Sequence, residues 1–325
     1  MKELKEHQPS ITIEEQVKNL KSIGMIINDE DKAKNILNDI SYFRLIKGFS
    51  LTVKTKNDKY TKGVTFEQVL GLYLFNARFR QLLFPEIEKI EINLRCRLAN
   101  YFSQKYNVLG YKEKENFGKP RYHKYFLWDI EKEIKRNYKT PFVKNFKEEY
   151  AGEEIPFYAL VEIISFGTLS KFFKNMKNED KKNVAKSFGV GYKYLESWIE
   201  TLAYVRNICA HYGRLYNAKF SKTPILYKEY QGDVSNNRVF GILICLKHLL
   251  FRDKHWNVFV DDLGSLFEEY EMVDKRTMGF TEAWKEMLGA EKAKHQDFTK
   301  TLKIPKNLKA IPKIIKSTWK TIRNE

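Results

Sequence analysis

Apolar side chains recur every three or four residues along most of this 325-residue chain. This spacing gathers them on one face of an α-helix. Helix start signals accompany the pattern, such as the capping-box pair Thr65 and Gln68. Strand-like alternation with turn residues marks the segment LTVKTKNDKYTKGVT at residues 51–65, which predicts a short hairpin or an ordered loop. The sequence therefore predicts an all-α fold.

Three of the expected helices bear on the later argument. Residues 29–50 read as one helix that ends near Gly48. Residues 65–106 read as a long helix that Pro85 should kink or break, because proline lacks the amide hydrogen and its ring clashes with the preceding turn. Residues 191–217 read as one uninterrupted helix.

The net charge of +17 and the pI near 9.4 indicate a polyanionic partner, either nucleic acid or an anionic membrane surface. The membrane is the weaker choice. The longest apolar run, near Val239 to Leu246, is far shorter than the roughly 20 residues that span a bilayer. The N-terminus also lacks the apolar core of a signal peptide. We therefore expect a nucleic-acid-binding protein, and the three isolated cysteines favour a reducing cytoplasm.

The sequence lacks the motifs of several common nucleotide-binding, metal-dependent and hydrolytic sites. The chain has no GxGxxG after a strand, no GxxxxGK[ST], no HExxH and no GxSxG. Its three cysteines, Cys96, Cys209 and Cys245, are far apart, and no Cys/His ligand spacing occurs. We expect no metal site, no cofactor and no disulfide framework.

Composition suggests three regions: an N-terminal helical region at 1–64, a helical domain at 65–290 and a basic tail at 291–325. Basic residues recur every three or four positions in the tail, whose role is either to neutralise phosphates or merely to add solubility. The tail lysines taken as candidate RNA contacts are Lys303, Lys306 and Lys313.

The segment VRNICAHYGRLYN, from Val205 to Asn217, groups polar residues in an apolar context. On a helical wheel of about 100° per residue, Asn207, His211 and Arg214 form a narrow stripe with Arg206 at its edge. Tyr212 and Tyr216 fall on the opposite, apolar side of the wheel. The wheel therefore predicts a buried face behind an exposed polar stripe.

This polar group suits metal-independent cleavage of RNA. Histidine titrates near neutrality, so His211 is the candidate general base for the 2′-OH proton. Arginine presents a planar fork of donors, so Arg206 is the candidate ligand of the phosphate and the transition state, with Arg214 as a further phosphate contact. Asn207 is the candidate residue that orients His211, and Asn217 is a candidate RNA contact.

Arg95 leaves two alternatives open. It follows Glu88 and Glu91 on one face of the helix predicted at 65–106, where opposite charges four residues apart form surface ion pairs. The other alternative is that Arg95 lines a nucleic-acid cleft.

RNICAH resembles the R[NH]xxxH motif of HEPN-domain ribonucleases. The bare Arg-to-His spacing is weak, since chance gives about 0.7 matches in such a chain, and it is only a hypothesis. The longer RNICAHYGRLYN resembles the signature of the Abi-like (AbiD/AbiF) abortive-infection family. Collinear stretches strengthen the likeness: EEQVKNLKSIGMII, ISYFRLIKGFS, TFEQVLGLYLFNARFRQLL, IEKIEINLR, SFGTLSKFF and LESWIETLAYVRNICAH. They cover roughly residues 10 to 230.

The resemblance implies a HEPN-like helical bundle with additional N-terminal and C-terminal helices. It implies a metal-independent endoribonuclease used against phage and toxic to its host. HEPN nucleases pair two motif copies, as type VI CRISPR effectors do within one chain. One copy here therefore implies a homodimer through the HEPN helix. Some relatives associate with a structured non-coding RNA, so a bound RNA is implied as a regulator.

Two positions depart from the family pattern. Tyr212 stands where a second histidine is common, and Tyr216 stands where tryptophan is common. The first departure removes a candidate acid. Two alternative functions stay open: a non-catalytic RNA-binding HEPN protein of an RNA–protein complex, and a membrane-surface protein acting through the basic tail.

Overall fold

The computed structural model describes residues 9–289 of the chain. Within this range it contains α-helices, short 3₁₀ and π turns, three isolated bridges and no strand, so the predicted all-α fold is confirmed. The α-helices are α1 (Ile13–Ser22), α2 (Glu30–Asp39), α3 (Phe66–Tyr106), α4 (Pro120–Arg136), α5 (Pro141–Glu149), α6 (Phe157–Ile163), α7 (Phe166–Asn175), α8 (Asn178–Ser187), α9 (Tyr192–Ala210), α10 (Val239–Leu249), α11 (Trp256–Glu269) and α12 (Trp284–Leu288).

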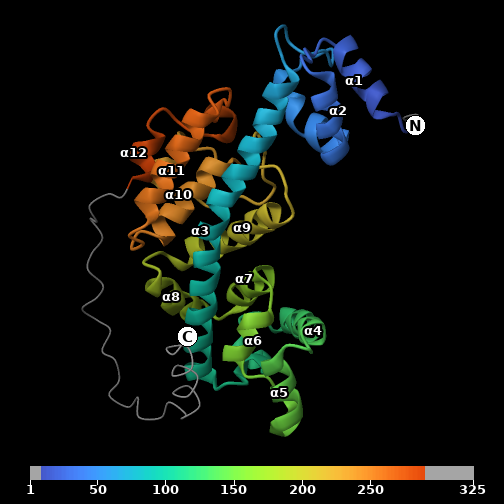
Figure 1. Cartoon of the computed structure of the whole chain (residues 1–325). Helices are drawn as coiled ribbons and strands as arrows, with labels where there is room; N and C mark the ends of the chain where they lie inside the picture. The colour runs from blue at the N-terminus through green and yellow to red at the C-terminus, as the bar shows by residue number, and fades with distance from the viewer. Residues whose placement is uncertain (1–8, 290–325) are drawn as a thin grey trace, which may run out of the picture. The chain divides into compact units, whose positions relative to one another are not determined.

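Helix α3 is the central element (Figure 1), and it packs against α6, α9, α11 and α8. Its start is the predicted capping box of Thr65 and Gln68. Of the two effects predicted for Pro85, a kink or a break, the break does not occur, because α3 runs unbroken through it. Pro85 lies on the exposed side, while Leu83 and Ile87 on either side of it are fully buried. Tertiary packing therefore holds the helix across the one hydrogen bond that proline removes.

The N-terminal segment consists of two helices and two short turns, and its π turn packs against α3. Helix α1 begins with a Thr12 capping box, and α2 begins with Asp29 as its cap. The predicted helix to Gly48 is interrupted, because α2 ends at Asp39 and Phe43–Lys47 forms a separate π turn. The predicted ordered loop is confirmed: Ser50–Val53 is a 3₁₀ turn, and a single antiparallel bridge joins Lys54 to Tyr60.

Aromatic clusters fix α3 at both ends. Near its C-terminal end Phe102 meets Phe157 and Phe172, whose ring centroids lie 5.4 and 4.9 Å away. Near its N-terminal end Phe75 meets Phe267, with centroids 5.7 Å apart. Each fully buried aromatic contributes roughly 1.5–3 kcal/mol by leaving water. These contacts tie α6, α7 and α11 to one helix.

A buried carboxylate reinforces the C-terminal end of α3. Asp180 of α8 is fully buried and accepts hydrogen bonds from Tyr101 (2.7 Å), Lys105 (2.6 Å) and Tyr106 (2.7 Å). Burial alone would raise the pKa of Asp180, but these hydrogen bonds outweigh it and the pKa is lowered. Asp180 is therefore held ionised in the fold.

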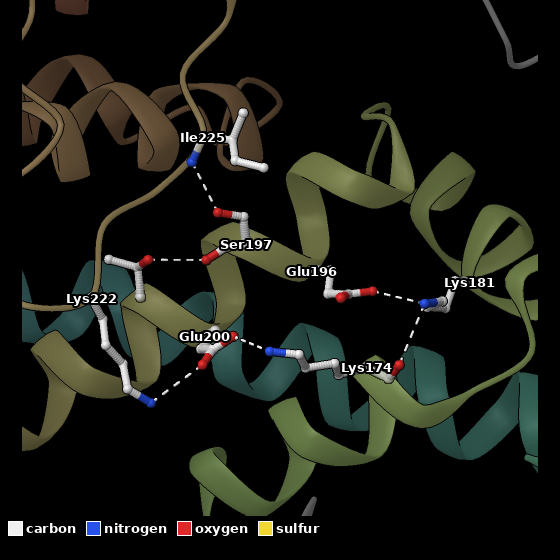
Figure 2. A network of polar contacts seen from close by, with 8 residues as sticks. Lys174, Lys181, Glu196, Ser197, Glu200, Lys222 and Ile225 are labelled. Atoms are coloured by element: carbon white, nitrogen blue, oxygen red, sulfur yellow. Dashed lines mark hydrogen bonds and ion pairs between the residues drawn. The ribbon is translucent and has the colours of Figure 1, made fainter. Parts of the chain in front are cut away.

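Ion pairs on its polar side position α9 (Figure 2). Glu200 receives Lys174 of α7 at 2.8 Å and Lys222 at 3.4 Å, and Glu196 receives Lys181 of α8 at 2.8 Å. Ser197 Oγ accepts the Ile225 N–H at 2.9 Å. These contacts lie within the first half of α9, so they hold the helix while its C-terminal end stays open to other groups.

No helix among residues 9–289 combines the length and the apolarity needed to cross a membrane. The division at residues 64/65 and 290/291 stays a prediction.

Candidate functional site

The predicted motif lies where α9 ends. The helix stops at Ala210, and His211 is its C-terminal cap, with its backbone N–H bonded to Asn207 O at 3.0 Å. Tyr212 N–H then bonds Cys209 O at 3.3 Å and Gly213 N–H bonds Ile208 O at 2.7 Å. This is the Schellman pattern of a reversing chain. The prediction of one helix to residue 217 is wrong.

Gly213 explains the reversal. A Cβ at this position would lie 2.7 Å from Ile208 Cγ2 and 3.0 Å from Ile208 O. Only glycine permits that approach without a shift of the chain. Tyr212 just before it has a φ of +57°, the left-handed conformation in which a side chain is strained.

The reversal divides the predicted polar stripe. Asn207 and His211 are one turn apart and both exposed, as predicted. Arg214 leaves the stripe, and its guanidinium donates to Gly48 O on the N-terminal segment. Tyr216 is buried as the wheel predicted, but Tyr212 is 69% exposed, so its predicted core position is wrong. The helical wheel does not apply beyond the residue where the helix ends.

Asn76 of α3 clamps the chain after α9. It is fully buried, and its Oδ1 accepts both the Leu215 N–H (2.7 Å) and the Tyr216 N–H (3.0 Å). Its Nδ2 donates to Gly213 O at 3.3 Å. One side chain therefore satisfies three backbone groups in a turn where no regular secondary structure would pair them.

Two arginines complete the clamp. Arg80, one turn after Asn76, donates to Gly213 O at 3.2 Å, and Arg44 donates to Tyr212 O at 3.3 Å. Burial lowers the pKa of Arg80. Cations at these carbonyls complement the negative end of α9. Asn76 and Arg80 were not among the predicted site residues, although two polar residues four apart in the apolar run GLYLFNARFRQLLF were a usable signal.

Arg206 is held from α3. Its Nε lies 3.3 Å from Glu91 Oε2, as an ion pair without well-aligned hydrogen-bond geometry. Its guanidinium carbon lies 5.6 Å from the centre of the Phe84 ring. Glu91 is buried, whereas 36% of the Arg206 side chain is exposed. The arginine is thus anchored at one edge and open to solvent at another.

Other predicted contacts have protein partners. Arg95 pairs with Glu91 and donates to Val161 O and Ile164 O, which gives it a structural role between α3 and α6. Asn217 accepts a hydrogen bond from Arg238 at 3.0 Å. Lys303, Lys306 and Lys313 lie outside the described residues.

A shallow depression of about 400 Å³ adjoins His211 along α3 and α9. The residues that line it are Ala77, Arg80, Gln81, Phe84, Pro85, Cys209, Ala210 and Tyr212. Burial raises the pKa of the Cys209 thiol to about 12. Cys209 therefore lines the depression as an uncharged thiol and does not act as a nucleophile. In the described range, no group of three or more His, Cys, Asp or Glu residues could hold a metal ion.

The region just described coincides with a family match. No curated protein and no solved structure matches this chain. Residues 35–217 match the family described as Abi-like protein, a span that begins in α2 and ends in the turn clamped by Asn76. That span is more than half of the chain, so the chain belongs to the Abi-like protein family.

Proposed function

We propose that this protein is a metal-independent endoribonuclease of abortive infection, with its active site at the end of α9. The family match supports the abortive-infection role. The observation that carries the chemistry is an exposed His211 on the same helix end as an Arg206 that Glu91 anchors. His211 stands five positions after Arg206, which is about 7.5 Å along the helix axis and about 140° around it, so the long Arg206 side chain must reach back toward His211. One phosphodiester could contact both.

In the proposed reaction His211 takes the proton of the ribose 2′-OH, and the 2′-oxygen attacks the neighbouring phosphorus. The bond to the 5′-oxygen breaks, and that oxygen leaves as a 5′-OH after gaining a proton. The other product carries a 2′,3′-cyclic phosphate. Arg206 stabilises the charge that develops on the phosphoryl oxygens. Asn207, whose amide has no partner in the described range, orients the imidazole or the phosphate.

We propose that a second copy of the chain supplies the acid. Tyr212 stands where a second histidine would follow His211, so one chain carries a single histidine at this helix end. Phe43 is 79% exposed and Tyr212 is 69% exposed, and the Arg44 bond to Tyr212 O brings their segments together. Exposed aromatic side chains of this size favour contact with a partner. A homodimer would therefore bring two His211 side chains together, and a structured RNA could regulate that contact.

The test compares the purified full chain with His211→Ala on single-stranded RNA in excess chelator. Loss of a general base costs about 10²- to 10⁴-fold in rate. His255→Ala, another exposed histidine, is the matched control and should cleave normally. The cut ends should carry 2′,3′-cyclic phosphate. Cleavage that survives His211→Ala, or that needs Mg²⁺, would refute the mechanism.

A non-catalytic RNA-binding protein is the second candidate. It is favoured by one observation: in the described part of the chain no side-chain hydrogen bond orients His211. Under this alternative, the wild type and His211→Ala slow cell growth equally and co-purify with the same RNA. Toxicity that disappears with His211→Ala supports the nuclease.

A further inference from the structure

A cavity between α4 and α7 lies on a different surface from the His211 site. These two helices pack together (Figure 1), and the cavity measures about 420 Å³. The residues that line it are Phe117, Lys119, Tyr122, Tyr125, Phe126, Asp129, Lys171, Phe172, Lys174 and Asn175. None of them belongs to the site proposed above. The wall is aromatic and the rim carries lysines.

The aromatic wall is open to solvent. Tyr122 is 45% exposed and Tyr125 is 58% exposed, while Phe126 and Phe172 behind them are buried in the core. Trp128 follows on α4 with 57% exposed. The three exposed rings occur at intervals of three residues on α4, within about a third of its circumference. Flat faces of this kind stack on nucleobases regardless of sequence.

An unpaired amide lies at the end of the cavity. Asn175 is 9% exposed, and its Oδ1 accepts the Lys119 N–H at 3.1 Å. Because a backbone N–H can only donate, this bond identifies the other amide atom as the nitrogen. That Nδ2 is buried and has no partner in the described part of the chain. Less than 1 Å² of this nitrogen is accessible, so an occupant that brings an acceptor would pair with it only after the neighbouring side chains shift.

Positive charge is distributed unevenly around the opening of the cavity. Lys171 pairs with Asp129 at 3.1 Å, which neutralises the one carboxylate of the lining, and Lys174 pairs with Glu200 at 2.8 Å. Residues 119–128 contain three cations and no acid. Among these, Lys119 and Lys124 lie over the rings of the tyrosines at 122 and 125, 5.9 and 5.1 Å from their centroids. Positive charge therefore concentrates on the α4 side, beside the exposed rings.

These features call for an occupant with a planar face, an edge acceptor and a negative charge close by. A nucleotide has all three, and it is free to enter only when its base is unstacked and unpaired. We propose that the cavity between α4 and α7 binds an unpaired base of single-stranded RNA, with the adjacent phosphates on Lys119 and Lys124. The base stacks on Tyr122 or Tyr125 when Lys119 or Lys124, which lies over that ring, moves onto the phosphate. This site does not require cleavage at His211.

The test uses the full chain with His211→Ala, so that no cleavage occurs, and a fluorescein-labelled single-stranded 12-nucleotide RNA. Fluorescence anisotropy at physiological salt should show at least tenfold weaker binding for Tyr122→Ala/Tyr125→Ala. Tyr125→Phe keeps the stacking face and should bind normally. Tyr158→Ala removes an equally exposed tyrosine outside the cavity and is the matched control. Asn175→Asp keeps the acceptor but removes the donor, and should weaken binding severalfold.

Crosslinking gives a readout that does not depend on the folding of a variant. RNA containing 4-thiouridine should crosslink the parent protein within residues 119–128. The proposal is overturned if no crosslink falls within residues 119–128, or if the double tyrosine variant folds and binds within twofold of its parent; crosslinks at the His211 site are expected as well. Equal weakening for a duplex of the same sequence would also overturn it, because a paired base cannot enter the cavity.

Discussion

Replacing Asn76 with alanine is the sharpest test of how α3 holds the chain after α9. The change removes the shared acceptor of the Leu215 and Tyr216 N–H groups, which belong to buried residues. Gly213 O keeps its bond from Arg80. Each buried donor left unpaired costs about 1–3 kcal/mol. Asn76→Ala should therefore lower the free energy of unfolding by about 3 kcal/mol.

For a domain of this size that loss corresponds to a fall in Tm of roughly 6–12 °C. Thermal melting followed by circular dichroism measures it. Asn100→Ala is the matched control, since Asn100 is an exposed asparagine of the same helix and should change stability by less than about 0.5 kcal/mol. Hydrogen exchange should localise the effect, with faster exchange of the Leu215 and Tyr216 amides at temperatures where the variant is folded.

The same variant tests the connection to function. At a temperature where it is folded, RNA cleavage should fall at least tenfold, because the turn that positions His211 has lost its clamp. A Tm within 2 °C of wild type would refute the stability reasoning. Normal cleavage despite the lower Tm would show that the clamp does not position His211.

Three further changes probe separate contacts. Tyr212→Gly should raise the free energy of unfolding by about 1 kcal/mol in denaturant melts, because glycine adopts positive φ without strain; a loss of stability would show that the exposed ring packs on something. Glu91→Gln should lower kcat/KM for RNA about tenfold by weakening the hold on Arg206, and an unchanged value would mean that Arg206 orients itself. Asp180→Asn should cost about 3 kcal/mol at pH 7. Because the pKa of Asp180 is lowered in the folded state, its ionised carboxylate stabilises the fold above the unfolded-state pKa near 3.9. This stabilisation is lost as the pH falls through the folded-state pKa. The difference in the free energy of unfolding between the wild type and Asp180→Asn should therefore be smaller at pH 3 than at pH 7. A difference independent of pH would contradict this account.

Local signals were enough to predict much of the fold. The cap at Thr65 lies where the sequence indicates, because a capping box involves only four neighbouring residues. The apolar periodicity predicted the helices for a similar reason, since one face must be buried whatever it meets. Pro85 is the exception. Its local preference against a helix yields to the buried residues on either side of it.

For the candidate site, the sequence by itself determined that Asn207 and His211 share one polar face, but it did not determine where α9 ends. It placed Asn207 and His211 one turn apart and exposed, because both lie within the helix or at its cap. Gly213 also signalled the stop, although the helix was predicted to continue. The sequence left the role of Arg95 open and offered Arg214 as a phosphate contact, since a cation looks the same whether its partner is a phosphate or a carbonyl.

Only the tertiary structure decided those roles. Asn76 and Arg80 come to the turn from a helix about 130 residues earlier. Arg44 and Gly48 come from farther still, and Glu91 selects the orientation of Arg206. Such pairings depend on which helices pack together. Helix packing depends on the summed burial of many apolar side chains, which no short motif records.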